Sequence, residues 1–149
     1  MKIEIDQSGR IEDTSKLSVV AYSNDHHKSL LITARDKKTI QVVFRKMGQP
    51  KLFVYKLFAV AIFVLIKNEL KRIDQIIIDR EYTGYENLIK QLIFEIAERN
   101  KKEIEKDIIH FHSIGRRCNA HGVSIKAYRM RRADIRLSAK EFFEIGVVK

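Results

Sequence analysis

Two aspartates and a histidine, far apart in the chain, have side chains that could act at a common chemical centre. Asp79 follows three consecutive isoleucines at residues 76–78, a short apolar run typical of a strand buried on both faces. Asp6 follows residues 2–5, whose polar and apolar side chains alternate as in a strand with one buried face. His121 comes late in the chain, near the start of an expected helix. Carboxylates are hard oxygen ligands for Mg²⁺ or Mn²⁺, and a histidine can bind a metal or carry a proton. The three residues are therefore candidates for a functional site.

Each of these residues also has an ordinary structural explanation. Asp79 could cap the helix that follows it, and Asp6 could form a turn over residues 6–9. His121 could be an exposed histidine near a helix N-terminus. Glu81, two residues after Asp79, could be a further metal ligand or an exposed side chain. For Asp79 the presence of the second aspartate favours a role in a site. In an open α/β sheet the ligand crevice lies outside the carboxyl ends of the strands, where Asp79 is expected.

Basic residues form a cluster in the last third of the chain. Seven of them lie within residues 116–136, with Tyr128 interleaved. They are Arg116, Arg117, Lys126, Arg129, Arg131, Arg132 and Arg136. Arginine offers a fork of N–H donors that suits phosphate oxygens. With a net charge of +10, the cluster favours nucleic acid, DNA or RNA, as the partner, and Lys56 is added to the expected contacts. The alternative is the solvated face of a basic protein.

Other residues with reactive side chains carry weaker indications. His110 and His112 would share one face of a strand, a spacing that can bind zinc or copper, but no acid or cysteine accompanies them, so we interpret them as structural. Cys118 is the one cysteine in the sequence. It excludes an internal disulfide and suits a reducing compartment.

The N-terminal residues and the hydropathy of the sequence predict a cytoplasmic protein without membrane association. The first six residues include acids where a signal peptide needs an apolar run. The longest apolar run, residues 52–66, is interrupted by Lys56 and is shorter than the roughly 20 residues that span a bilayer.

The elements expected to position these residues follow the order β-β-β-α-α-β-α-β-α-α. Strands are expected at residues 2–5, 17–23, 29–34, 76–78 and 108–113, the first three as an antiparallel meander. Helices are expected at residues 37–47, 52–71, 83–99 and 120–130, with Asp36 as the N-cap of the first and a last helix after the capping box at residues 138–141. The pattern predicts one α/β domain over residues 1–149, with a mixed five-stranded sheet covered by helices.

This order of elements resembles the ribonuclease H-like superfamily, which includes ribonucleases H, Holliday-junction resolvases, transposase and integrase cores and Argonaute slicer domains. Residues 3–9 look like the first strand of that fold, with its aspartate and a Ser/Gly turn. Residues 76–79 look like the fourth strand, which ends in a second aspartate. Residues 115–121 look like the turn and helix that carry the last ligand. In topology the resemblance covers nearly the whole chain, whereas in sequence it is limited to short motifs.

The resemblance implies a nuclease that uses Mg²⁺ or Mn²⁺ to hydrolyse phosphodiesters. Asp6 and Asp79 would be metal ligands and catalytic residues, with Glu81 as a local second acid and His121 as a late ligand or proton carrier. One departure concerns the Glu that the superfamily usually supplies from the helix before the fourth strand. That place falls near Tyr55 and Lys56, where there is no acid.

Two alternatives stay open at this point. The first is a non-catalytic nucleic-acid-binding or assembly protein on the same fold, which the absent helix Glu favours. The second is a protein-interaction module, with a homodimer formed through apolar side chains of residues 40–66.

Overall fold

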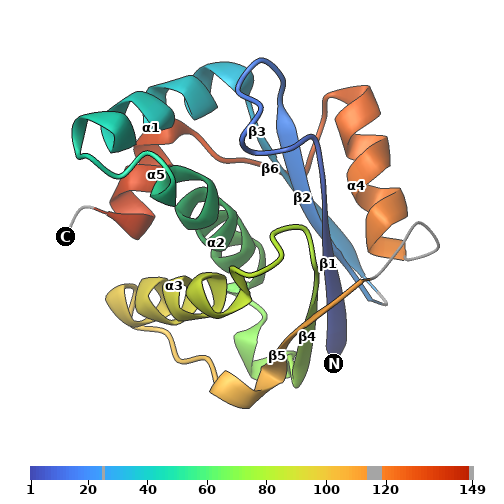
Figure 1. Ribbon diagram of the computed structural model, residues 1–149. Coiled ribbons are helices and arrows are strands. Elements are labelled where there is room, and N and C mark those ends of the chain that lie inside the picture. Colours follow the sequence, from blue (N-terminus) through green and yellow to red (C-terminus); the bar gives the residue numbers. More distant parts are fainter. Residues whose placement is uncertain (25, 114–118, 148–149) are drawn as a thin grey trace.

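The computed structural model describes residues 1–24, 26–113 and 119–147, and its centre is a six-stranded mixed sheet (Figure 1). The strand order is β5-β4-β1-β2-β3-β6. The strands are β1 (Lys2–Ser8), β2 (Ser18–Ser23), β3 (His27–Ile32), β4 (Gln75–Asp79), β5 (Ile109–His112) and β6 (Ile135–Arg136). Strands β1, β2 and β3 form the antiparallel meander, β4 and β5 run parallel to β1, and β6 runs parallel to β3.

Five α-helices of the described residues cover the two faces of this sheet unequally. They are α1 (Ala34–Lys46), α2 (Leu52–Ile66), α3 (Glu86–Arg99), α4 (Asn119–Met130) and α5 (Ala139–Gly146). Figure 1 shows α4 alone on one face, over β1, β2 and β3, and the other four helices on the opposite face. Two short 3-10 turns, Leu70–Arg72 and Lys106–Ile108, lead into β4 and β5. None of the helices in the described ranges is long and apolar enough to cross a membrane.

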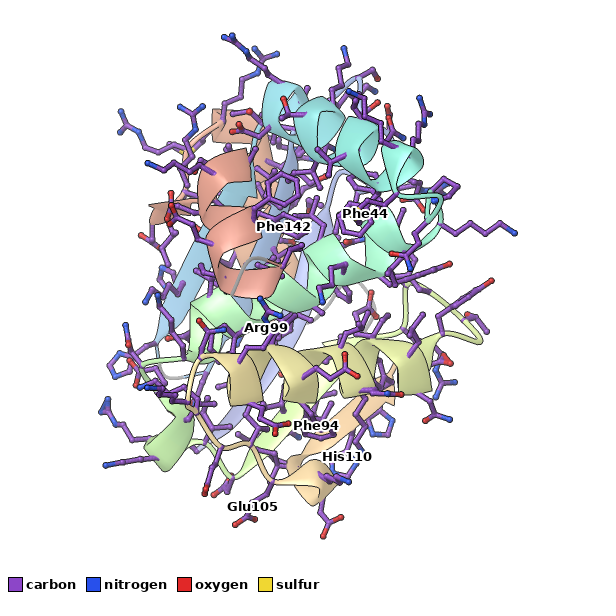
Figure 2. The ribbon with its side chains drawn as sticks, turned by 90° about the vertical axis from the view of Figure 1, so that its left-hand side faces the viewer. Phe44, Phe94, Arg99, Glu105, His110 and Phe142 are labelled. Atoms are coloured by element: carbon purple, nitrogen blue, oxygen red, sulfur yellow. The ribbon has the colours of Figure 1, made fainter. Side chains whose placement is uncertain are left out.

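The main core lies between the sheet and the four-helix side. Helix α2 is apolar nearly all round, so it is buried among the sheet, α1, α3 and α5. Figure 2 shows Phe44 of α1 and Phe142 of α5 turned toward each other, with ring centroids 6.0 Å apart. Ile3 and Ile5 of β1 complete this core and have no exposed surface. The long apolar run is therefore an internal helix, as its composition predicts.

Strand β1 is longer than the sequence pattern predicts, which corrects the expected turn at residues 6–9. Asp6 pairs with Ala21, and the pairing with β2 continues through Gln7 and Ser8. The chain turns at Gly9, where φ is +79° and a Cβ would lie 2.5 Å from the Leu17 carbonyl oxygen. Asp6 therefore lies on a rigid strand and not in a loop.

The predicted five-stranded sheet is also corrected, because the structure has a sixth strand. Residues Ile135–Arg136 pair with Leu30 and Leu31 at the outer edge of β3. A strand of two residues is too short to show the alternation by which strands are recognised. Strand β3 itself spans His27–Ile32, two residues earlier than expected, since Asn24 bonds to the His26 carbonyl at the hairpin (2.7 Å).

Helix boundaries differ from the expected ones for local reasons. The N-cap of α1 is Thr33 and not Asp36, because the Thr33 hydroxyl accepts the Asp36 N–H at 3.1 Å. The second helix ends at Ile66, where the bonding changes to i→i+3 (Glu69 N–H to the Ile66 carbonyl, 2.9 Å). The capping box at Ser138 is confirmed, since its hydroxyl accepts the Glu141 N–H at 3.1 Å.

The third helix begins at Glu86, three residues later than expected. A turn precedes it, in which the Tyr85 N–H bonds to the Tyr82 carbonyl (3.0 Å) and Gly84 has φ +91°. Residues 80–85 therefore form a loop that follows β4 directly.

Candidate metal centre

Three carboxylates meet where β1 and β4 lie side by side. Ile5 pairs with Ile78 in the parallel ladder, so the next residue of each strand, Asp6 and Asp79, comes to the same level of the sheet. Glu81 follows two residues later and is held by its N–H to the Asp79 carbonyl (2.9 Å). One carboxylate oxygen from each of the three residues lies within 4.8 Å of the others. The structure thus brings together the three acids that the sequence suggests as metal ligands.

The environment opposes the ionisation of Asp6 and Glu81 in the absence of a cation. Burial raises the pKa of Asp6, against the hydrogen bond from His121, which lowers it. Desolvation, a hydrogen bond to Asp79 and repulsion from Asp79 and Asp6 raise the pKa of Glu81 to about 7. A divalent cation among these oxygens would relieve the repulsion. An all-oxygen donor set suits Mg²⁺ or Mn²⁺ better than zinc or copper.

His121 contacts the centre through Asp6. It lies in the first turn of α4, which packs across β1, and its Nδ1 is 2.9 Å from Asp6 Oδ2. Among the described residues, the group of potential ligands within 4.8 Å of one another contains the three acids and not His121. With Asp6 ionised, the neutral ring carries its proton on Nδ1 and leaves Nε2 as an acceptor. This arrangement fits the proton-carrier alternative better than the ligand alternative.

Two buried serines support Asp6, and the sequence analysis missed both. Ser124 Oγ lies 3.2 Å from Asp6 Oδ2, 3.0 Å from the His121 carbonyl oxygen and 2.9 Å from Ser8 Oγ. A hydroxyl has one proton, so Ser8 donates to Ser124 when Ser124 donates to Asp6. Two periodicities could have indicated them: Ser8 shares a strand face with Asp6, and Ser124 lies one helical turn after His121.

No acid approaches from the part of α2 where the resemblance places a Glu. Tyr55 packs against tyrosines, and Lys56 faces α3, where Glu95 and Arg99 act on its charge. Burial lowers the pKa of Lys56. Figure 2 shows Arg99 between α3 and α5. The structure therefore places Lys56 away from the carboxylates, and its expected nucleic-acid contact stays a prediction.

The basic cluster is distributed around α4. Lys126, Arg129, Arg131 and Arg132 are exposed on α4 and just after it. Lys126 and Arg132 also line a hollow of about 650 Å³ that lies between α4 and the β2–β3 part of the sheet. Arg136 pairs with Asp36 of α1 at 3.6 Å. Arg116, Arg117 and Cys118 lie outside the described residues.

Two further residues lie near the centre that the sequence analysis did not assign to it. Arg10 follows the Gly9 turn, and its positive charge acts to lower the pKa of Glu81. His112 pairs with Asp79 in the β4–β5 ladder, and the His110 ring lies two residues before it on the same face, 6.5 Å away. Strand pairing brings His112 beside the acids, which its position in the sequence alone does not reveal.

Comparisons with known proteins give no match for this chain. No protein-family model, no curated protein and no solved structure matches it. The geometry and chemistry of the centre are therefore the observations that bear on function.

Proposed function

We propose that this protein is a nuclease of ribonuclease H-like type that hydrolyses phosphodiesters with Mg²⁺ or Mn²⁺. The observation that carries the proposal is the convergence of Asp6, Asp79 and Glu81 within 4.8 Å at the adjoining strands β1 and β4. An antiparallel meander followed by parallel strands, which the resemblance implies, supports the same conclusion.

The residues of this chain would divide the work as follows. Asp6, Asp79 and Glu81 hold the metal, which when bound supplies a Lewis acid that activates water and stabilises charge on the phosphate. His121 Nε2 would accept the proton that the attacking water loses, because Asp6 fixes the ring through Nδ1 (2.9 Å). The exposed guanidinium of Arg10 is the nearby cation that suits a phosphate oxygen.

The decisive experiment compares Asp79, at the end of β4, with Asp74, just before the start of β4. Asp79→Asn removes a proposed ligand at the end of the strand, whereas Asp74→Asn changes an exposed residue just before its start, which pairs with the N-terminal amine at 2.9 Å. We expect Mn²⁺ binding, followed by the electron paramagnetic resonance of the ion, to be lost in Asp79→Asn and retained in Asp74→Asn. Cleavage of single-stranded and duplex DNA and RNA should follow the same pattern. Cleavage that persists in Asp79→Asn would refute the proposal.

One observation favours a second candidate, a nucleic-acid-binding protein without catalysis. Helix α2 has Tyr55 and Lys56 where the resemblance places a catalytic Glu. In that case the wild-type protein binds nucleic acid with the salt dependence of phosphate contacts, and neither Mg²⁺ nor Mn²⁺ induces cleavage. The homodimer through residues 40–66 stays a prediction. The apolar side chains of α2 are mostly buried inside the protein, and within that range Val42 and Met47 are the large apolar side chains exposed on the surface.

A further inference from the structure

Two stacked tyrosines, one near the start of α2 and one in the loop that follows Glu81, have no role in the mechanism above. The rings of Tyr55 and Tyr85 are nearly parallel, with an interplanar angle of 15° and centroids 4.3 Å apart. Tyr85 is 42% exposed, whereas Tyr55 is partly buried. Because one face of the Tyr85 ring is against Tyr55, much of the exposed area must belong to its other face and its edge. The stack therefore ends in an open aromatic surface.

The turn before Tyr85 is open at Gly84. This residue has φ +91°, and a Cβ added there would meet no atom within 4 Å outside its chain neighbours. Access to the Tyr85 ring is shown by the 42% exposure of Tyr85 itself.

A third tyrosine connects the stack to the carboxylates. The Tyr82 ring meets the Tyr55 ring edge-on, at 87° and 5.7 Å, and its hydroxyl accepts a hydrogen bond from Gln7 Nε2 (3.0 Å). Gln7 directly follows Asp6 on β1, and Tyr82 directly follows Glu81. The strand that carries Asp6 and the loop that carries Glu81 are therefore both joined to the stack by specific contacts. By strand alternation the Gln7 side chain leaves β1 on the face opposite to Asp6, so the stack and the carboxylates lie at the same end of β1 on different faces.

The chemistry of the surface selects a flat, weakly polar ligand. Burial, together with a hydrogen bond to Tyr85, raises the pKa of Tyr55 to about 12, so the ring that backs Tyr85 stays uncharged near neutral pH. A planar heterocycle can extend such a stack, and nucleobases do so on exposed tyrosines with little dependence on sequence. In a duplex both faces of a base are occupied by its neighbours, so a base must be unstacked to reach the ring.

We infer that Tyr85, backed by Tyr55, is the stacking platform for an unpaired base next to the phosphodiester at the metal centre. The inference rests on the proposed function and specifies its substrate class: single-stranded nucleic acid, or a strand with an unpaired end or loop. The simpler role for Tyr85, as an apolar cover over the start of α2, predicts no preference for unpaired bases.

The test measures binding without cleavage, in protein carrying Asp79→Asn and without divalent metal. The probes are a short single-stranded DNA containing 2-aminopurine, the same strand with an abasic site in place of that base, and the blunt duplex. We expect the single strand to bind more tightly than the duplex, with quenching of 2-aminopurine on binding. Tyr85→Ala should lower the affinity for the single strand roughly tenfold and abolish the quenching, while the affinity for the duplex stays unchanged.

Three further variants separate stacking from structural cover. Tyr85→Phe keeps the ring, so this variant should bind the single strand as tightly as the protein with Tyr85. Tyr85→Leu keeps an apolar cover without a flat ring and should lose the quenching as Tyr85→Ala does, with the same thermal unfolding midpoint as Tyr85→Phe. Val42→Ala, at a 45% exposed apolar residue of α1, is the control for loss of exposed apolar surface and should bind normally.

The outcomes distinguish failure of this inference from failure of the proposed function. Wild-type-like binding and quenching in Tyr85→Ala or Tyr85→Leu overturns the platform, even if cleavage depends on Asp79. Equal affinity of the protein for single strand, abasic strand and duplex overturns it as well. If Tyr85 governs single-strand binding but no metal induces cleavage, the platform is supported and the nuclease is refuted.

Discussion

On one face of β1, Ile3 and Ile5 are completely buried against α2, whereas on the other face Asp6 and Ser8 are buried in a hydrogen-bonded network with α4. The two faces alternate residue by residue along the same strand. The first face is held by apolar contact, which has no preferred direction. The second depends on particular donors at particular places, because a buried carboxylate needs partners for each oxygen.

The difference shows where this protein gains stability and where it gives stability up. Apolar burial on the α2 side stabilises the fold. On the α4 side three acids are held together against their mutual repulsion. Such an arrangement is expected at a functional site and is costly elsewhere.

The sharpest test of the comparison is Asp6→Asn. The amide keeps the shape of the carboxylate and removes one negative charge from the cluster, so the free energy of unfolding should be unchanged or higher. Cleavage in Mn²⁺ should fall by roughly 10²–10³-fold, the size typical of losing one electrostatic element of an active site. Parallel denaturant titrations and cleavage rates measure both effects. A loss of stability as large as the loss of activity would mean that Asp6 is mainly structural.

Ile5, the residue before Asp6, should show the opposite pattern, a loss of stability without a loss of metal binding. Ile5→Ala leaves a cavity in the α2 side of the core, where Ile5 has no exposed surface, and should lower the free energy of unfolding by about 2–5 kcal/mol. Below the unfolding transition the affinity for Mn²⁺ should stay within about twofold of wild type. Val42→Ala, at an exposed apolar residue of α1, should change stability by no more than about 0.5 kcal/mol. Weak metal binding by folded Ile5→Ala would show that the two faces are coupled.

The sequence predicts the two faces of β1 to different extents, for a physical reason. Periodicity predicts the apolar face, since every second residue is enough to place Ile3 and Ile5 in the core. It places Asp6 and Asp79 at the ends of strands, but their convergence depends on β1 lying next to β4, a strand order that periodicity does not give. It does not predict that β1 continues past Asp6 or that Ser8 and Ser124 complete the network. Those contacts depend on how α4 packs against the sheet, which no local sequence pattern predicts.

Long-range pairing explains most of the remaining differences. Strand β6 exists because β3 offers an edge to two residues more than a hundred positions later. His112 becomes a neighbour of Asp79 only through the β4–β5 ladder. Tyr55 and Tyr85 are thirty positions apart, and their stack follows from the packing of α2 against the loop before α3. The proposed catalytic role of His121 and the bound metal stay predictions.

Lys37 is a buried basic residue on the otherwise apolar side. The pH dependence of the free energy of unfolding tests how that side tolerates its charge. Lys37 has no exposed surface, and its Nζ donates to the carbonyls of Arg10 and Asp13 and to Ser18 Oγ. Burial lowers its pKa from 10.5 to about 8. The unfolded chain therefore holds more protons between these values, so stability should rise as the pH increases from about 8 to about 10.

The expected rise is about 3 kcal/mol at most and should be absent in Lys37→Met. Denaturant titrations of both proteins at several pH values give the difference, in which the other titrating groups cancel. A parallel pH dependence in wild type and variant would show that Lys37 keeps an ordinary pKa.

Metal binding at the polar face should itself depend on pH. Glu81 has a pKa of about 7, so below that pH a cation must displace its proton. The apparent affinity for Mn²⁺ should rise up to roughly tenfold per pH unit below pH 7 and level off above it. Glu81→Gln should bind Mn²⁺ more weakly and flatten this dependence. A dependence that is unchanged in Glu81→Gln would assign the displaced proton to another group of the cluster.

The smallest expected effects belong to the basic residues around α4, which in the proposed function would bind substrate only through charge. Arg129→Ala should weaken nucleic-acid binding and lower the slope of log affinity against log salt by about 0.7–0.9, the value for one phosphate contact. Arg45→Ala, at an exposed arginine of α1 on the opposite face of the sheet, is the matched control and should change neither. A phosphate contact is lost equally for every base, so Arg129→Ala should weaken single strand and abasic strand alike, whereas Tyr85→Ala should weaken only the strand that carries the base. If both variants reduce the two affinities in the same ratio, charge alone governs the polar face and the centre has no means of selecting an unpaired base.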